Sequence, residues 1–276
     1  MCTLEGLAQR IADRAQATQV PDECLTVGLC GSQGSGKTTL TANLKVLLEE
    51  RGLSVAALSL DDFYLPRNVR EDLARTVHPL LTTRDVPGTH DIALALQVFA
   101  DLPQDGRVSL PAFDKALDDR RPQSEWVQTP APVHVILFEG WCVGAMPQSE
   151  EALSRPINAL ERDEDLHGTW RRYVNRALAQ AYQPLFRQID LLILLAAPGF
   201  DVVYRWRLEQ ENELRRSVAA QGGDASRLMS DAELERFVSH YERLTRHILS
   251  EMPARADIVV RLDAQRRKSM DPLASN

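Results

Sequence analysis

Residues 31–38 read GSQGSGKT, and this stretch decides the fold. It places Gly31 and Gly36 before Lys37 and Thr38, in the spacing G-x-x-x-x-G-K-[ST] of a phosphate-binding P-loop. The glycines allow backbone conformations that other residues avoid, so successive N–H groups can turn inward around an anion. We expect Lys37 to reach the β- and γ-phosphates of a nucleotide and the Thr38 hydroxyl to bind Mg²⁺. The stretch therefore predicts a nucleotide-phosphate site.

Apolar segments on both sides place this loop between a strand and a helix. Residues 24–30 (CLTVGLC) predict a buried strand, and residues 37–51 place leucines on one helical face before Gly52 ends the helix. A third segment, 54–60 (SVAALSL), predicts the next strand and completes a β-α-β unit. This context favours a phosphate site over a glycine turn without a ligand. We expect contacts to ATP from the whole motif: Gly31, Ser32, Gln33, Gly34, Ser35, Gly36, Lys37, Thr38 and Thr39.

The rest of the chain alternates between strand and helix patterns. Further strands are predicted at 133–139, 189–196 and 257–262. Helices are predicted at 4–18, 169–187, 200–220 and 230–251, the last with a capping box of Ser230 and Glu233. The alternation predicts an α/β fold of the P-loop NTPase type: an open parallel sheet of about five strands, with helices on both faces, in a single domain over residues 1–276. We expect the polar tail after Asp263 to be loose.

A long proline-rich segment at 61–132 interrupts this alternation. Eight prolines break it, and only residues 91–101 have a helical pattern. Structureless segments of this length are uncommon unless they are functional. We therefore predict a mostly irregular, substrate-binding insertion that lies over the strand ends.

Charge and composition exclude several classes of protein. The formal net charge is −7, which argues against a nucleic-acid binder that needs a basic face. The apolar runs are far too short to span a membrane, and charges interrupt the N-terminus every few residues. The four cysteines show no C-x-x-C pairing, which favours reduced thiols and a cytoplasmic location. Composition does not indicate an oligomeric state.

Missing motifs narrow the kind of P-loop protein. The guanine-reading N-K-x-D segment and the L-S-G-G-Q signature of transporter ATPases are both absent from the sequence. Residues 85–88 (DVPG) fit a bare D-x-x-G, but they follow no predicted strand and are interpreted as a proline turn. Small-molecule kinases remain as the main class.

Carboxylates follow two of the predicted strands. Asp61 and Asp62 end the strand at 54–60, where a carboxylate can accept the proton of an attacking hydroxyl. Neighbouring residues on an extended segment point to opposite sides, so we expect one base, Asp61; the alternative is that both cap a turn. Glu139 ends the strand at 133–139 and is expected to support Mg²⁺, with capping of a turn at Gly140 as the alternative.

Several segments together resemble a known family. They are GSQGSGKTTL (31–40), LSLDDFYL (58–65), HPLL (78–81), PGTHD (87–91), FDK (113–115), LFEGWCVG (137–144) and VYRWRLEQE (203–211). This set is similar to the D-glycerate 3-kinase family, within the wider group of uridine kinase, phosphoribulokinase and pantothenate kinase. The similarity runs from about Cys24 to Leu262. One departure is the loop between Lys115 and Arg120, which lacks the glycines usual in that family.

The resemblance implies a reaction and roles for particular residues. The reaction is D-glycerate plus ATP giving 3-phosphoglycerate and ADP, with Asp61 as the base and Glu139 as the support for the metal. Arg205 and Arg207 would clamp the transferring phosphoryl group from a lid-like helix at 199–222. The acceptor contacts that we predict are Asp62, Tyr64, Arg84, His90, Asp91, Lys115 and Arg120.

Other interpretations stay open on sequence alone. The acceptor of a kinase of this group could be a nucleoside, pantothenate or a sugar instead of D-glycerate. A protein of another class could use ATP as a regulatory switch. The charged segment 204–216 is by default a solvated helix face with paired charges, and each arginine of the insertion a solvated surface residue.

Overall fold

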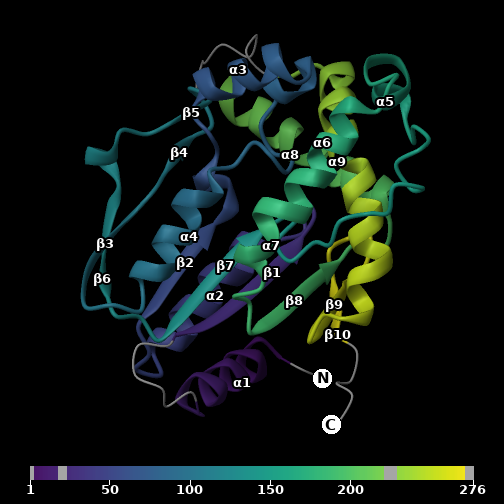
Figure 1. Cartoon of the computed structure of the whole chain (residues 1–276). Helices are drawn as coiled ribbons and strands as arrows, with labels where there is room; N and C mark the ends of the chain where they lie inside the picture. Colours follow the sequence, from purple (N-terminus) through teal and green to yellow (C-terminus); the bar gives the residue numbers. More distant parts are fainter. Residues whose placement is uncertain (1–2, 18–23, 221–228, 271–276) are drawn as a thin grey trace.

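Strand β1 (Leu25–Gly31) lies inside a six-stranded sheet in a computed structural model that describes residues 3–17, 24–220 and 229–270. It pairs in parallel with β7 (Val135–Gly140) on one side and with β8 (Leu191–Ala196) on the other. All residues of these three strands are buried, which explains their continuous apolar sequences. The sheet order is β10-β9-β8-β1-β7-β2, as Figure 1 shows.

The outer strands of the sheet agree with the predicted strands except that the sheet has one additional strand. The edge strand β2 (Val55–Ser59) and strand β9 (Ile258–Leu262) continue the parallel sheet, as expected. The sheet has one strand more than the five expected, because β10 (Lys268–Met270) pairs antiparallel with β9. This strand lies in the tail that we expected to be loose. Its polar sequence hides it, because an edge strand needs only backbone hydrogen bonds on one side.

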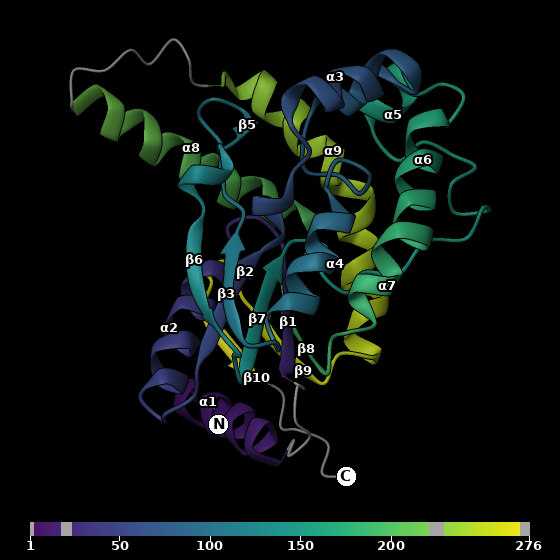
Figure 2. The same cartoon turned by 60° about the vertical axis from the view of Figure 1, so that its left-hand side comes forward.

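Helices cover both faces of the sheet and form two hydrophobic cores. Figure 2 shows α2 (Lys37–Glu49) on one side of the sheet and α4 (Ile92–Asp101) on the other. The first core, on the α2 side, joins α2 to α1 (Leu4–Ala17) and α8 (Phe200–Ala220). The second core includes the buried face of α4. Helix α9 (Asp231–Glu251) contributes to both cores, and its predicted capping box is present. Within the described ranges, no helix is long and apolar enough to cross a membrane.

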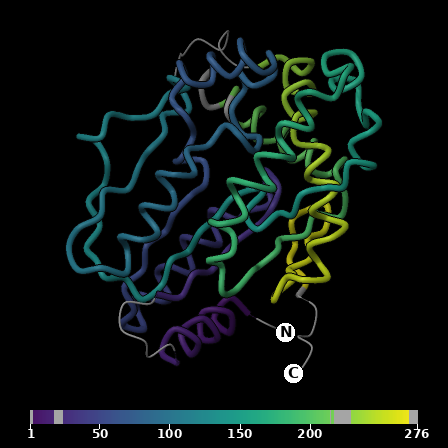
Figure 3. The backbone as a smooth tube through the Cα atoms, viewed as in Figure 1, coloured from purple at the N-terminus to yellow at the C-terminus, as the bar shows by residue number. Residues whose placement is uncertain are grey.

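The insertion at 61–132 is more regular than we expected. It contains α3 (Arg67–Thr76), the predicted helix as α4, and two antiparallel ribbons. One ribbon pairs β3 (Gly106–Leu110) with β6 (Val127–Ala131), and the other pairs β4 (Phe113–Asp114) with β5 (Asp119–Arg120). The ribbons stand out on the left of Figure 3. Several prolines lie where they do not break structure: Pro66 precedes α3, and Pro130 is in a ribbon whose strands are both edges.

The segment predicted as one helix at 169–187 is interrupted. It consists of α6 (Thr169–Ala177), a π-helical turn at Leu178–Tyr182 and α7 (Gln183–Phe186). Pro184 has no backbone N–H, so it cannot continue the regular hydrogen bonding. The Gln183 side-chain amide donates to the Leu178 carbonyl, at the start of the π-helical turn, at 3.1 Å. A short helix before it, α5 (Ala159–Glu164), was not predicted.

Candidate active site

A pocket of about 580 Å³ lies beside the P-loop, where β1, β2 and β7 end. Twelve of the predicted site residues line it: Gln33, Gly34, Gly36, Lys37, Thr38, Thr39, Asp61, Asp62, Arg84, Lys115, Glu139 and Arg207. Residues that sequence reasoning missed line it too: Ser59, Asp85, Trp141, Gln210, Phe237 and Tyr241. The P-loop, the insertion and helices α8 and α9 therefore converge on one site.

The P-loop has the backbone geometry that its glycines predict. Gly34 and Gly36 have φ angles of 78° and 85°, in the left-handed region. Helix α2 begins at Lys37, so its positive N-terminal end faces the pocket. Ser32 and Ser35 are buried and do not line the pocket, and a Cβ at Gly31 would lie 2.7 Å from the Ser35 hydroxyl oxygen. These outer motif positions shape the loop from behind.

Helix α8 packs directly on the P-loop. A Cβ at Gly34 would approach the Cβ of Trp206 to 2.8 Å, so only glycine fits this contact. The Trp206 indole N–H donates to the Ala264 carbonyl at 2.9 Å, and Arg266 Nε donates to the Gly34 carbonyl at 2.8 Å. The loop is therefore held from outside by α8 and by the turn between β9 and β10.

Glu139 and Thr38 form the arrangement expected of a Mg²⁺ site. The Thr38 hydroxyl donates to Glu139 Oε1 at 2.9 Å, and Lys37 Nζ lies 3.9 Å from Oε2. Oε2 is buried and has no hydrogen-bond partner, which leaves an acceptor for a hydrated cation. Among the described residues, no three His, Cys, Asp or Glu side chains cluster as metal ligands. A cation held here would take its remaining ligands from phosphate and water, as Mg²⁺ does in nucleotide sites.

Asp61 is held between two donors. Lys115 Nζ lies 2.6 Å from its Oδ2, and the Tyr64 hydroxyl donates to its Oδ1 at 2.8 Å. Burial raises the pKa of Asp61, but the charges of Lys115 and Lys37 more than offset this and hold that pKa below its usual value. Asp61 is therefore ionised at neutral pH, as a proton acceptor must be.

Its neighbour Asp62 has a different environment. Asp62 Oδ1 accepts a long hydrogen bond of 3.4 Å from the Phe113 N–H. Burial raises the pKa of Asp62 to about 6, and the nearby Asp61 charge adds to this. The two carboxylates thus have separate partners and opposite pKa shifts. They lie in a 3-10 helix (Leu60–Phe63) and not in the extended segment that we expected, and both line the pocket.

Cations of the insertion are divided between the pocket and its outer wall. Arg84 and Lys115 line the pocket, and Arg84 Nη1 pairs with Asp118 at 2.5 Å. Arg120 instead pairs with Asp91 at 3.1 Å and donates to the Tyr64 carbonyl at 2.8 Å. Arg120, Asp91 and Tyr64 lie outside the pocket lining, and their contact with an acceptor stays a prediction. The ion pair of Arg120 with Asp91 joins β5 to the N-terminus of α4.

His90 is also behind the pocket wall. It is 5% exposed, its Nδ1 lies 2.6 Å from the Tyr182 hydroxyl, and its ring lies 4.5 Å from that of Tyr64. Burial lowers its pKa to about 3, so it is neutral. His90 therefore packs against Tyr64, and the Tyr64 hydroxyl in turn holds the Asp61 carboxylate.

The two arginines predicted on α8 point to different places. Arg207 lines the pocket, where it pairs with Glu211 at 3.2 Å and lies over the Phe237 ring. Arg205 is exposed and does not line the pocket, because two residues along a helix point to different faces. The predicted lid at 199–222 matches α8 to residue 220, and residues 221–222 lie outside the described residues.

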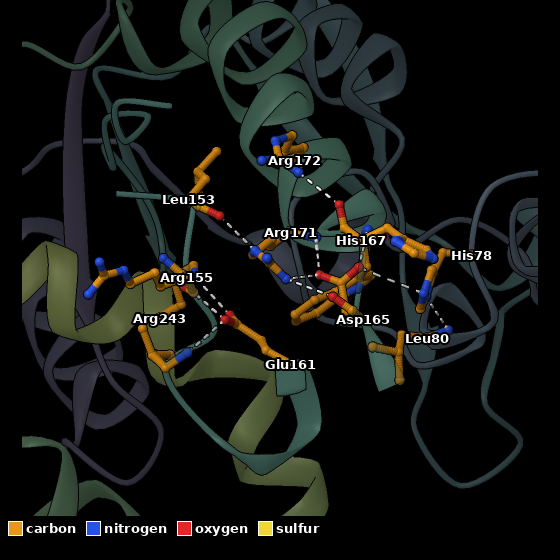
Figure 4. Close-up of polar contacts among 12 residues, drawn as sticks. His78, Leu80, Leu153, Arg155, Glu161, Asp165, His167, Arg171, Arg172 and Arg243 are labelled. Carbon is orange, nitrogen blue, oxygen red and sulfur yellow. Dashed lines mark hydrogen bonds and ion pairs between the residues drawn. The ribbon is translucent and has the colours of Figure 1, made fainter. Parts of the chain in front are cut away.

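Buried ion pairs position α9, which brings Phe237 and Tyr241 to the pocket. Arg243 of α9 binds Glu161 of α5 with Nε 2.6 Å from Oε1, and Arg171 Nη1 binds Asp165 at 2.9 Å (Figure 4). All four side chains are nearly inaccessible to solvent. Breaking such a pair would leave an uncompensated buried charge, so the network fixes α9 against α5 and α6.

Comparison with known proteins agrees with this geometry. Residues 26–146 match the model of the phosphoribulokinase/uridine kinase family. The chain is 35% identical to an uncharacterised kinase of Schizosaccharomyces pombe, over 87% of each chain. It is 32% identical to the chloroplastic D-glycerate 3-kinase of Arabidopsis thaliana, over 79% of this chain and 46% of the relative.

A solved structure extends the similarity to the fold. The D-glycerate 3-kinase of Cryptococcus neoformans superimposes with a TM-score of 0.77 and 26% identity, covering 97% of each chain. The fold thus has a counterpart in a kinase along almost the whole chain. The protein belongs to the phosphoribulokinase/uridine kinase family of P-loop kinases and is a homologue of the D-glycerate 3-kinases.

Proposed function

We propose that this kinase transfers the γ-phosphoryl group of ATP to the 3-hydroxyl of D-glycerate, giving 3-phosphoglycerate and ADP. The observation that carries the proposal is one ionised carboxylate, Asp61, beside two cations, Arg84 and Lys115, in the same pocket as the P-loop. A base and a carboxylate-binding pair are what a small hydroxy acid requires. The similarity to two proteins named D-glycerate 3-kinase supports the same acceptor.

The nucleotide half of the pocket would bind ATP through the P-loop. Backbone N–H groups of residues 33–38 and the Lys37 ammonium would hold the β- and γ-phosphates. Thr38 and Glu139 would hold Mg²⁺, which neutralises charge on the phosphates when bound. Arg207 lines the same pocket and would stabilise charge on the transferring group. Arg205 would need α8 to move before it could contribute.

The acceptor half would bind D-glycerate and remove one proton. Asp61 takes the proton of the 3-hydroxyl as the hydroxyl oxygen bonds to the γ-phosphorus, and the bond from that phosphorus to the bridging oxygen breaks to release ADP. Arg84 and Lys115 would bind the carboxylate of the acceptor. Because Lys115 pairs with Asp61 here, acceptor binding would draw Lys115 away and raise the basicity of Asp61.

Residues behind the wall would act through those that line it. Tyr64 fixes the Asp61 carboxylate, and His90, Asp91 and Arg120 hold Tyr64 and the β4–β5 ribbon in place. We assign them positioning roles. Asp62 faces the pocket and stays a candidate for direct contact with the acceptor.

An acceptor panel tests the proposal. ADP release is measured with Mg·ATP and D-glycerate, L-glycerate, uridine, pantothenate or a hexose, and phosphorus NMR identifies the phosphorylated hydroxyl. We expect D-glycerate to give the highest kcat/KM and 3-phosphoglycerate as product. A nucleoside, pantothenate or sugar that exceeds D-glycerate would overturn the acceptor. ATP binding without stimulation by any acceptor would favour a nucleotide-dependent regulatory protein.

A further inference from the structure

Asp85 has a backbone conformation that a non-glycine residue adopts only under constraint. Its φ angle is 102°, and among the described residues only Asp118 and Arg266 share a positive φ without being glycine. Such conformations cost free energy and persist where the surroundings determine them, often at ligand sites. Glycine would adopt this φ freely. A reason for an aspartate here must therefore come from its side chain.

Three hydrogen bonds from separate segments fix Asp85. Its N–H donates to the Thr89 hydroxyl at 3.1 Å, and its carbonyl accepts from the Trp141 indole N–H at 2.9 Å. The Tyr241 hydroxyl donates to its Oδ2. These partners come from the insertion, from the loop after β7 and from α9. The carboxylate is therefore aimed by the fold and not by its own turn alone.

The second carboxylate oxygen is available to a ligand. Asp85 lines the pocket and is 8% exposed, yet Oδ1 makes no hydrogen bond with any described residue. Burial raises the pKa of Asp85 to about 7, and the nearby charge of Asp61 adds to this. Because this oxygen belongs to a carboxylate that lines the pocket, a hydroxyl from a bound molecule can donate a hydrogen bond to it.

We propose that Asp85 accepts a hydrogen bond from the acceptor hydroxyl that is not phosphorylated, the 2-hydroxyl of D-glycerate. The inference rests on the proposed function and makes Asp85 a specificity-determining residue for a 2,3-dihydroxy acid. Charge sets the orientation of the acceptor: its carboxylate is repelled by Asp61 and attracted by Arg84 and Lys115. With the carboxylate and the 3-hydroxyl placed, the 2-hydroxyl is the remaining donor.

The test compares D-glycerate with 3-hydroxypropionate in the wild type and in D85G. 3-Hydroxypropionate keeps the carboxylate and the 3-hydroxyl and lacks only the 2-hydroxyl. Glycine suits the φ of 102° and removes only the side chain, so D85G should fold. Thermal unfolding checks that D85G is folded. The KM for ATP checks that the rest of the site is intact, and we expect it within about twofold of the wild-type value.

We expect the wild type to prefer D-glycerate by about 10- to 100-fold in kcat/KM, the range for a hydrogen bond to a charged group. In D85G this preference falls below about threefold, because activity on D-glycerate drops while activity on 3-hydroxypropionate is largely kept. Equal loss on both acceptors, or an unchanged preference, overturns the inference and leaves Asp85 a purely structural residue.

Two outcomes separate this inference from the proposed function. A wild type without activity on D-glycerate defeats the proposed function and this inference together. Activity on D-glycerate with no discrimination against 3-hydroxypropionate defeats this inference alone. If D85G does not fold, D85N decides: its amide can make only a neutral hydrogen bond with the 2-hydroxyl in place of the bond to a carboxylate, so the preference should fall at least about fivefold. An unchanged preference in D85N overturns the inference.

Discussion

The two halves of the pocket are built in different ways. The nucleotide half is built mainly on one contiguous stretch, residues 33–39, whose backbone and helix end form the phosphate site, and Glu139 and Arg207 complete it. The acceptor half is formed by residues of the insertion, Asp61, Arg84, Asp85 and Lys115, together with Tyr241 of α9. Tyr241 lies 156 residues after Asp85 in the sequence. In this structure Asp61 pairs with Lys115 and Arg84 pairs with Asp118, whereas the nucleotide half keeps a buried oxygen of Glu139 without a hydrogen-bond partner.

This difference indicates which half can vary. A backbone nest tolerates change in neighbouring side chains, because its N–H groups stay in place. A site made of paired side chains changes its ligand preference when one member changes, since the partner is then left uncompensated. Substitutions in the acceptor half should therefore alter the choice of acceptor, and those in the nucleotide half the handling of ATP.

The largest effect is expected from Asp61→Asn. The amide has nearly the same shape but cannot accept the proton, so turnover with D-glycerate should fall about 1,000-fold. ATP affinity, measured by calorimetry, should stay within about threefold, because Asp61 belongs to the acceptor half. Asp62→Asn serves as the matched control, with less than about a tenfold loss expected. If Asp61→Asn keeps a tenth of the turnover, the base lies elsewhere.

The next largest effect is expected on the Mg²⁺ requirement, which depends on the nucleotide half. Glu139→Gln removes the carboxylate charge beside Thr38, so the Mg²⁺ concentration for half-maximal activity should rise about 30-fold. The KM for D-glycerate should not change. Glu49→Gln, on an exposed face of α2, is the control and should match the wild type. A Mg²⁺ dependence that does not move would separate Glu139 from the metal.

Lys115→Met tests the acceptor half through two readouts. Loss of a cation that binds the carboxylate should raise the KM for D-glycerate about 10-fold and leave the KM for ATP unchanged. Loss of the same charge raises the pKa of Asp61, so kcat/KM should begin to fall at a higher pH than in the wild type as the solution is acidified. Lys45→Met on α2 is the control. An unshifted acid limb would mean that Lys115 does not tune Asp61.

The smallest effect concerns stability and Asp85. Its pKa in the folded protein is about 7, above the usual 3.8, so folding favours the neutral carboxyl. That contribution is complete below about pH 4 and is lost as the pH rises toward 7, at about 1.4 kcal/mol per pH unit in between. Asp85→Asn does not titrate. Urea unfolding measures this: from pH 5 to pH 6, the free energy of unfolding of the wild type should fall by about 1 kcal/mol more than that of Asp85→Asn. A constant difference would contradict the raised pKa.

The sequence predicts what depends on local pattern. The P-loop follows from its glycine spacing, and the neighbouring positions of Asp61 and Glu139 follow from two apolar strands that each end in an acid. Asp85 was interpreted as part of a proline turn, and nothing within residues 85–88 indicates that Tyr241 reaches it. His90 and Asp91 have the residue types of a binding site, but their partners Tyr182 and Arg120 place them behind its wall.

The contact between Gly34 and Trp206 gives the protein an optical probe of its own. The indole is fully buried and rests on the P-loop backbone, next to the cation of Arg266. Indole emission responds to nearby charge and to small changes of packing. Filling the phosphate nest changes both, so the occupancy of the nucleotide site can be followed by intrinsic fluorescence, without a label and without turnover.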